Sequence, residues 1–232
     1  MGSADACIVT GYVRLDSDHR GHERYCDLGR RLLSIGATTV AYLDPAAEVR
    51  ARPGLLRLHA ALDRCWYWHA SEGARVSAGN PAKDSRAFMA VQHQKTSWLA
   101  DAVQWTEAET LVWIDYGLLH VAGITEQAVA DFVVRARAAH RGVISMPTIW
   151  GPPDFPVSPA RVAWHCAGGI VVVPRDLAGW LHVQVEREAR RMLEAGFATW
   201  EVNTWAEVWR RNPDMFTSWD CDHDATLVEA GP

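Results

Sequence analysis

The order of apolar and polar positions divides the chain into alternating strands and helices. Five short apolar runs, several rich in β-branched residues, have the length of buried strands, and they span 6–13, 38–44, 110–117, 143–150 and 168–174. Six segments repeat apolar residues at a spacing of three and four, which predicts helices over 21–36, 54–66, 85–103, 124–142, 176–196 and 201–213. This alternation predicts an α/β fold with a parallel sheet and helices packed against it.

Two stretches interrupt the pattern and are expected to be loops. Residues 69–85 are rich in Gly, Ser, Asn and Pro, and residues 151–159 contain four prolines. A loop as long as the first is often functional in a compact domain. The tail after residue 213 has no clear periodicity.

Composition narrows the class of protein. With 232 residues, 49% of them hydrophobic and 22% charged, the chain can bury a sizeable core. The net charge of −5 gives no general attraction to nucleic acid. Five cysteines without a C-x-x-C pair argue against a disulfide scaffold or a zinc ribbon. No apolar run reaches about 18 residues, and the start lacks a signal peptide pattern, so we expect a cytoplasmic protein without a membrane span.

The run "LVWIDYGLLH" places a carboxylate, Asp115, where a strand leaves the core. Ligands of open α/β sheets bind beyond the carboxyl ends of the strands, and an acid there can hold a divalent cation and, through it, a diphosphate. The commoner alternative is an acid that only meets water.

Three later features carry possible chemistry. Gly168 and Gly169 in "WHCAGG" let the backbone approach a ligand closely, or else make a tight turn. Glu201 opens the last predicted helix, where it is a general-base candidate or only a stabilising helix-start acid. The segment 219–224, "WDCDHD", offers oxygen and imidazole ligands suited to Mg²⁺ or Mn²⁺, or is an ordinary acidic tail.

Lys95 is out of place on the apolar stripe of its predicted helix. It lies four residues after Val91 and three before Trp98, which both belong to that stripe. A lysine there either extends its ammonium group to solvent or meets an anion.

The order of these features resembles that of a known enzyme class. Strand-end Asp, glycine loop, helix-start Glu and late His follow one another as do the DxD motif, G-loop, xED motif and C-terminal histidine of GT-A glycosyltransferases. The chain resembles the bacterial and viral WlaTC/HtrL-like glycosyltransferases in "YCDLGRRLLSIG", "KDSRAFMAVQHQKTSWLADA", "LVWIDYGLLH", "HCAGGIVVVP", "WEVNTWAEVW" and "NPDMFTSWDCDHD". The resemblance implies one GT-A-like domain over 1–232, a three-layer α/β/α sandwich with a mixed, mostly parallel sheet.

The resemblance also implies roles for individual residues. A nucleotide-sugar, most simply a UDP-sugar, would be the donor, and Mn²⁺ or Mg²⁺ would neutralise the departing diphosphate. Glu201 would take the proton from the acceptor hydroxyl. The remaining implied residues are metal ligands Asp115, Asp222 and His223, and donor-binding residues Thr10, Gly11, Tyr12, Lys95, Asp115, Gly168 and Gly169.

Two departures from the family motifs bear on the mechanism. Asp-Tyr-Gly stands where DxD is expected, so metal dependence would be weaker or would rely on His223 and Asp222. Trp-Glu-Val stands where xED is expected, so only the glutamate remains, and inversion is favoured while retention stays open.

The acceptor is the least determined part of the reading. Loops 69–84 and 151–163 would select it, with Trp150, Phe155 and Trp164 as stacking surfaces. One subgroup that resembles this family is the set of viral glycosyltransferases associated with DNA base oxygenases, which glycosylate 5-hydroxymethylcytosine in DNA. That resemblance would imply a DNA acceptor, although the acidic net charge counts against DNA. The other acceptor is a saccharide or lipopolysaccharide. Two further classes stay open: a metal-dependent phosphoester hydrolase and a non-catalytic nucleotide- or nucleic-acid-binding module.

Overall fold

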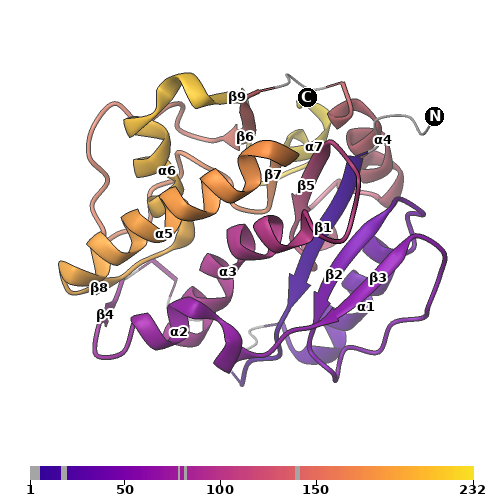
Figure 1. Ribbon diagram of the computed structural model, residues 1–232, viewed down its shortest axis with the longest axis horizontal. Helices are drawn as coiled ribbons and strands as arrows, with labels where there is room; N and C mark the ends of the chain where they lie inside the picture. Colours follow the sequence, from indigo (N-terminus) through magenta and orange to yellow (C-terminus); the bar gives the residue numbers. More distant parts are fainter. Residues whose placement is uncertain (1–5, 17–19, 78, 81–82, 139–141) are drawn as a thin grey trace.

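The computed structural model describes residues 6–16, 20–77, 79–80, 83–138 and 142–232. Its centre is a sheet in the order β3-β2-β1-β5-β7-β6-β9 (Figure 1). The strands are β1 (Ala6–Tyr12), β2 (Thr39–Leu43), β3 (Leu55–His59), β5 (Thr110–Ile114), β6 (Ile144–Thr148), β7 (Ile170–Pro174) and β9 (Phe216–Asp220). A separate parallel pair joins β4 (Arg75–Val76) to β8 (Phe197–Ala198).

The sheet is mixed and mostly parallel, as the sequence predicted. Strands β3, β2, β1 and β5 run parallel to one another. Strand β7 is antiparallel to both β5 and β6, and β9 is parallel to β6. The reversal at β7 brings its N-terminal end beside the C-terminal end of β5, and this juncture positions the candidate site.

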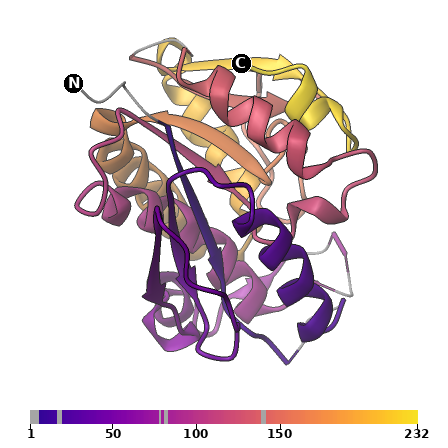
Figure 2. The same cartoon turned by 90° about the vertical axis from the view of Figure 1, so that its right-hand side faces the viewer.

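Helices cover both faces of the sheet, which confirms the three layers. The helices are α1 (His22–Leu33), α2 (Trp66–Ala70), α3 (Arg86–Ala102), α4 (Glu126–Ala136), α5 (Ala178–Glu194), α6 (Glu201–Arg211) and α7 (Thr226–Glu229). Helices α2, α3, α5 and α6 contribute to the core on one face, and α1, α4 and α7 lie on the other (Figures 1 and 2).

Strand β1 shows why this sequence makes a two-sided sheet. Cys7 and Val9 face the α3 core, while Ala6 and Ile8 face the core of α1 and α4. All four side chains are buried. Since successive strand residues point to opposite faces, a continuous apolar run is what a strand covered on both sides requires.

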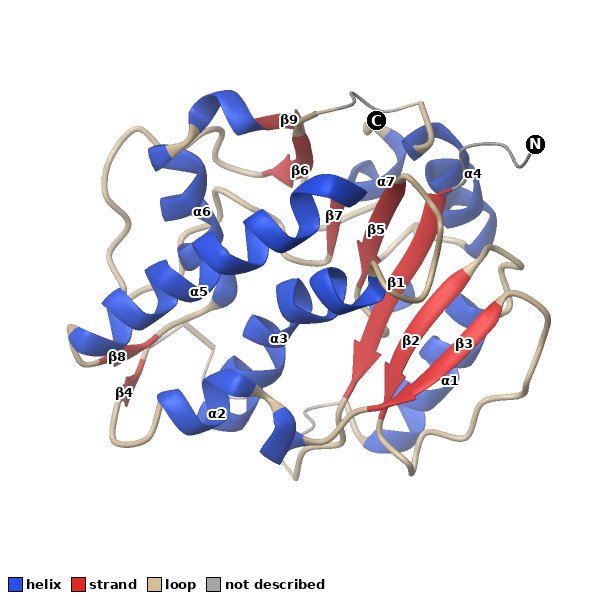
Figure 3. Cartoon of the chain, viewed as in Figure 1, coloured by secondary structure: helices blue, strands red, loops and turns tan. Residues whose placement is uncertain are grey.

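The structure differs from the sequence pattern in two places (Figure 3). Residues 54–66 are not one helix: Leu55–His59 form the edge strand β3, a short 3₁₀ turn follows, and α2 begins only at Trp66. The tail, which shows no clear periodicity in the sequence, supplies edge strand β9 and helix α7. In both edge strands the pairing with a neighbour, which local periodicity does not report, decides the conformation.

The helix predicted over 124–142 ends earlier than expected. Helix α4 stops at Ala136, and part of the predicted remainder, 139–141, lies outside the described residues, as do positions 78 and 81–82 of the predicted loop 69–84. In the described ranges, none of the helices combines the length and apolar character needed to cross a membrane.

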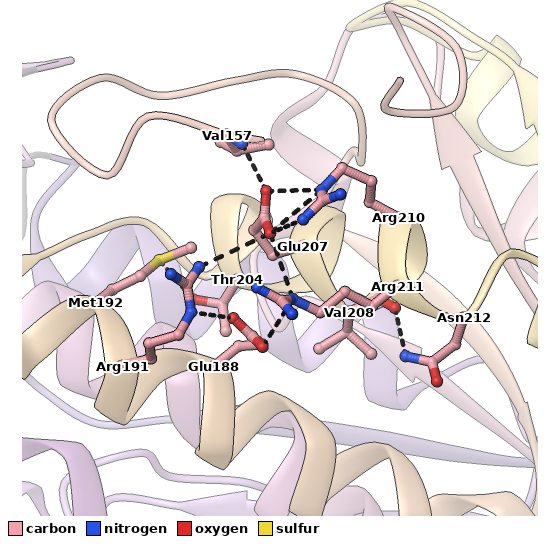
Figure 4. A network of polar contacts seen from close by, with 10 residues as sticks. All are labelled: Val157, Glu188, Arg191, Met192, Thr204, Glu207, Val208, Arg210, Arg211 and Asn212. Atoms are coloured by element: carbon pink, nitrogen blue, oxygen red, sulfur yellow. Dashed lines mark hydrogen bonds and ion pairs between the residues drawn. The ribbon is translucent and has the colours of Figure 1, made fainter. Parts of the chain in front are cut away.

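A buried ionic network fixes α6 to α5 (Figure 4). Glu207 is fully buried, and its Oε2 accepts from Arg210 at 3.0 Å, while its Oε1 accepts from the backbone N–H of Val157 at 2.6 Å. Glu188 of α5, also buried, pairs with Arg211 of α6 at 3.0 Å, which joins the two helices. Because buried carboxylates need such partners, the network holds α6 in place, and α6 begins at Glu201.

Candidate active site

A cavity of about 210 Å³ opens at the C-terminal ends of β1 and β5. Gly11 and Tyr12, at the end of β1, line it together with Asp115, which directly follows β5. Gly168 and Gly169, just before antiparallel β7, line it from the other side. The cavity therefore lies where ligands of open α/β sheets bind.

Lys95 joins two carboxylates at the floor of this cavity. Its Nζ lies 2.9 Å from Asp115 Oδ1 and 2.8 Å from Glu201 Oε1, and it donates to the Gly168 carbonyl at 2.9 Å. The residue is 2% exposed. Burial alone would lower the pKa of Lys95, but the two carboxylates outweigh burial and raise the pKa. The ammonium group therefore stays charged at neutral pH.

One carboxylate oxygen of Asp115 is hydrogen-bonded within the protein, and the other is available to a ligand. Its Oδ1 accepts from Trp113 Nε1 at 2.7 Å as well as from Lys95. Trp113 precedes Asp115 by two residues, so strand alternation puts both side chains on one face. The Asp115 side chain is 34% exposed, and Oδ2 lies 4.0 Å from the position that a Cβ on Gly169 would take. Oδ2 is thus the oxygen left for a ligand.

Glu201 is the first residue of α6 and is 2% exposed. Its Oε1 is paired with Lys95, while its Oε2 is buried without a hydrogen-bond partner in the described part of the chain. A side chain on Gly168 would clash with Oε1, so the close approach of carboxylate and backbone requires glycine there. Glu201 therefore has one anchored oxygen and one acceptor without a protein partner.

Further cationic groups line the cavity besides Lys95. Lys83 is half-buried, and its Nζ lies 5.9 Å from the centre of the Trp200 ring. Burial, and then the charge of Arg20, which also lines the cavity, lower the pKa of Lys83. His120 also lines the cavity, but burial lowers its pKa and its ring is therefore neutral at pH 7; its Nδ1 lies 2.6 Å from the Gly117 carbonyl oxygen. The cavity is therefore suited to anions.

Aromatic rings form part of the cavity wall. Tyr12 stacks on Tyr25 and on Tyr116, with ring centroids 5.6 and 5.3 Å apart. The Tyr12 hydroxyl lies 2.9 Å from His22 Nδ1. On another part of the wall, Trp164 meets His223 edge to face at 5.0 Å. Such flat apolar surfaces suit a nucleobase or a sugar ring.

The structure brings most of the predicted residues to the one cavity. Those that line it are Gly11, Tyr12, Lys95, Asp115, Trp164, Gly168, Gly169, Glu201 and His223.

Four predicted residues lie elsewhere. Thr10 is fully buried in β1. Asp222 accepts the backbone N–H of His223 at 2.7 Å and is not part of the lining. Trp150 and Phe155 are 57% and 80% exposed and stand outside the cavity. Donor binding by Thr10, metal binding by Asp222 and acceptor binding by the two aromatic residues stay predictions.

The donor groups at the cavity do not form a complete metal site by themselves. Among the residues that the structure describes, no group of three or more His, Cys, Asp or Glu is placed to hold a metal ion. Asp115 and His223 line the same cavity, but Asp115 Oδ1 already accepts from Lys95 and Trp113. Mg²⁺ and Mn²⁺ favour several oxygen ligands, so these side chains fit such an ion poorly.

Sequence reasoning missed Trp113, Tyr116, Arg20 and Lys83. The first two could have been found from the sequence, since both lie within two residues of Asp115. Strand alternation also puts Trp113 on the same face as Asp115. Lys83 lies in the loop that was expected to be functional, but no periodicity marks it. Arg20 carries no local signal, because only the tertiary fold brings it to the cavity.

Comparisons with known proteins agree with this architecture. A scan against protein-family models gave no match, and a search of curated proteins gave none either. Among solved structures, the chain is similar to a glycosyltransferase involved in glycosylation of the major capsid of PBCV-1. The TM-score is 0.51 at 12% sequence identity, over 93% of this chain and 81% of that one. At this identity the likeness concerns the fold alone, and the three-layer sheet architecture is consistent with a GT-A-like fold.

Proposed function

We propose that the protein is a glycosyltransferase that moves a sugar from a nucleoside-diphosphate donor, most simply a UDP-sugar, to an acceptor hydroxyl. The observation that carries the proposal is the bridge at the cavity floor: Lys95 holds Asp115 and Glu201 together across two segments of the chain. This pair of carboxylates stands beneath an aromatic and cationic cavity in a glycosyltransferase-like fold.

Glu201 supplies the base in this proposal. Its Oε2, which has no partner in the described part of the chain, accepts the proton of the acceptor hydroxyl as the acceptor oxygen bonds to the anomeric carbon. The bond from that carbon to the diphosphate oxygen breaks, and its electron pair leaves with the diphosphate. Lys95 keeps Oε1 fixed and so leaves Oε2 for the acceptor. Attack from the face opposite the diphosphate gives inversion.

The donor and acceptor parts of the cavity follow from its lining. Tyr25, half-buried and backed by the buried rings of Tyr12 and Tyr116, suits the nucleobase, because flat rings bind bases by stacking. Trp164, on another part of the lining, suits the acceptor. For the acceptor we propose 5-hydroxymethylcytosine in DNA, with a saccharide as the second candidate. Either offers a primary or secondary hydroxyl to Glu201.

The test is sugar transfer measured by mass. The protein is incubated with UDP- and GDP-sugars and with either hydroxymethylcytosine-containing DNA or oligosaccharides. Glu201→Gln should reduce transfer about 10²- to 10⁴-fold, the usual range for loss of a general base, and should leave nucleotide affinity nearly unchanged. Glu194→Gln, at the exposed end of α5, is the matched control and should transfer normally.

The outcomes separate the competing classes. Full transfer by Glu201→Gln would remove Glu201 as the base. Phosphoester hydrolysis without any sugar donor would favour a hydrolase. Nucleotide binding without turnover of any donor would favour a binding module.

A further inference from the structure

The chain contains only two lysines, Lys83 and Lys95, among its 23 lysine and arginine residues, and both line the cavity. Lysine differs from arginine in carrying a compact point charge with three rotatable donors. The rest of the chain uses arginine for its cationic side chains, so the cavity is the part of the molecule where lysine is used.

Lys95 has no donor to spare for a ligand. An ammonium group has three N–H donors and no acceptor. Lys95 has three oxygens within hydrogen-bond distance, on Asp115, Glu201 and Gly168. Binding a phosphate with Lys95 would break one of these contacts and leave a carboxylate or a carbonyl without its partner, at a cost. The contacts therefore favour a structural role for Lys95, whereas the family resemblance implied that it binds the donor.

Lys83, in contrast to Lys95, has donors free for a ligand. Its Nζ makes no ion pair or hydrogen bond with the described residues, and its one contact with a ring is the 5.9 Å approach to Trp200. Burial and then the neighbouring Arg20 charge lower the pKa of Lys83 by more than the carboxylates of Asp115 and Glu201 raise it. An anion in the cavity would relieve both effects.

Asp84, the residue after Lys83, is hydrogen-bonded to the residue before Glu201. Asp84 accepts the backbone N–H groups of Gly79 and Asn80, each at 2.7 Å, and also the indole N–H of Trp200 at 2.9 Å. Trp200 is the residue that directly precedes Glu201 at the start of α6. These contacts tie the loop carrying Lys83 to the helix that carries the proposed base.

The charge of the cavity lining points to an anionic ligand. Lys95 is matched by the carboxylates of Asp115 and Glu201, whereas Lys83 makes no ion pair with the described residues. A diphosphate would offset the charge of Lys83, whereas a divalent cation would add to it. The side chains that could ligate a metal ion are few, as described above.

We propose that Lys83, with Arg20 beside it, binds the diphosphate of the donor directly, so that the nucleotide binds without a divalent metal ion. The proposal rests on the proposed function for the identity of the ligand as a nucleoside diphosphate. It assigns neutralisation of the leaving diphosphate to protein side chains. Lys95 then has the separate task of holding the two carboxylates.

The experiment measures binding of UDP, and separately of inorganic pyrophosphate, by calorimetry in EDTA and in Mn²⁺. Wild-type protein should bind UDP in EDTA with an affinity within a few-fold of that in Mn²⁺. Lys83→Met should weaken binding roughly 10- to 100-fold, the range for loss of one charge-assisted hydrogen bond, and Lys83→Arg should restore most of it. Arg187→Met, which removes an equal charge from the exposed face of α5, should bind normally.

Chemical labelling gives a readout that is independent of affinity. Because Lys95 is 2% exposed and Lys83 is half-buried, an amine-acylating reagent should modify Lys83 first. UDP in EDTA should protect Lys83, read by the mass of its peptide. Pyrophosphate should also protect it if the diphosphate alone is recognised. Protection by UDP but not by uridine places the phosphates, rather than the base, at Lys83.

The results distinguish this inference from the proposed function. Binding that needs Mn²⁺, with Lys83→Met equal to wild type, overturns the inference and leaves the glycosyltransferase proposal standing. Metal-free binding with protection of Lys83, but no sugar transfer to any acceptor, supports the inference and counts against the glycosyltransferase. No binding of UDP, GDP or pyrophosphate under either condition overturns the inference and removes the support for a nucleotide-sugar donor.

Discussion

Replacing Lys95 by methionine should destabilise the protein strongly. Lys95 and Glu201 side chains are each 3% exposed, and their ion pair is 2.8 Å long. Methionine matches the length of lysine without its charge, so the loss comes from leaving Glu201 buried and unpaired. Removing one partner of a buried pair costs about 3–5 kcal/mol, a large part of a typical total of about 5–15 kcal/mol. For a chain of this size that corresponds to about 6–20 °C in Tm.

The assay is urea unfolding of Lys95→Met, Glu201→Gln and the double variant, which form a double-mutant cycle. The double variant should recover most of the loss, because Gln without its charge needs no ammonium partner. Asp115 stays charged but is 34% exposed, so water offsets its loss of Lys95. Lys83→Met is the control, with no ion pair among the described residues, and should change stability by less than about 1 kcal/mol. The reasoning would be refuted if Lys95→Met were as stable as wild type. It would also be refuted if the double variant were no more stable than Lys95→Met.

Three further predictions concern the cavity and its surroundings. Asp115→Ala should reduce donor turnover to below about one hundredth of wild type, measured as nucleotide release, and unchanged turnover would take Asp115 out of the site. Gly168→Ala should lose activity and about 1–3 kcal/mol of stability, because its Cβ would displace Glu201, whereas Gly179→Ala, with open space around it, should cost nothing in thermal unfolding. Burial lowers the pKa of His93 to about 3, so below about pH 6.5 the unfolded chain gains a proton that the native protein does not. Stability should therefore fall on acidification by up to about 1.4 kcal/mol per pH unit, and urea midpoints from pH 7 to pH 4 should show a shallower fall in His93→Gln.

Much of the sheet and its helices followed from sequence because the elements are long or fully apolar. Strands such as β1 and β5 are buried on both faces, so their runs are unbroken. Edge strand β3 differs, with three leucines within four positions and mostly half-buried residues. Such a short run fits a strand or a helix equally, and the parallel pairing with β2 decides between them.

The site was predictable to the extent that it lies on regular elements. The inward position of Lys95 followed from the helical stripe, and that of Asp115 from the end of the strand. Lys83 was not predictable, because its place in the cavity depends on Asp84 reaching Trp200 across 116 positions of the chain. The sequence also does not reveal that all three N–H donors of Lys95 are used, since their acceptors are three oxygens from distant segments of the chain.

The bridge through Lys95 also constrains how this protein can evolve. A mutation of Lys95 alone leaves the buried Glu201 carboxylate without its counter-ion, and natural proteins have only a small margin of stability to lose. A mutation of Glu201 alone is milder, because Lys95 still pairs with Asp115 at 2.9 Å. An inactive descendant can therefore discard the proposed base and keep the lysine, whereas a homologue that loses the lysine should also have lost Glu201 or carry a new counter-ion nearby.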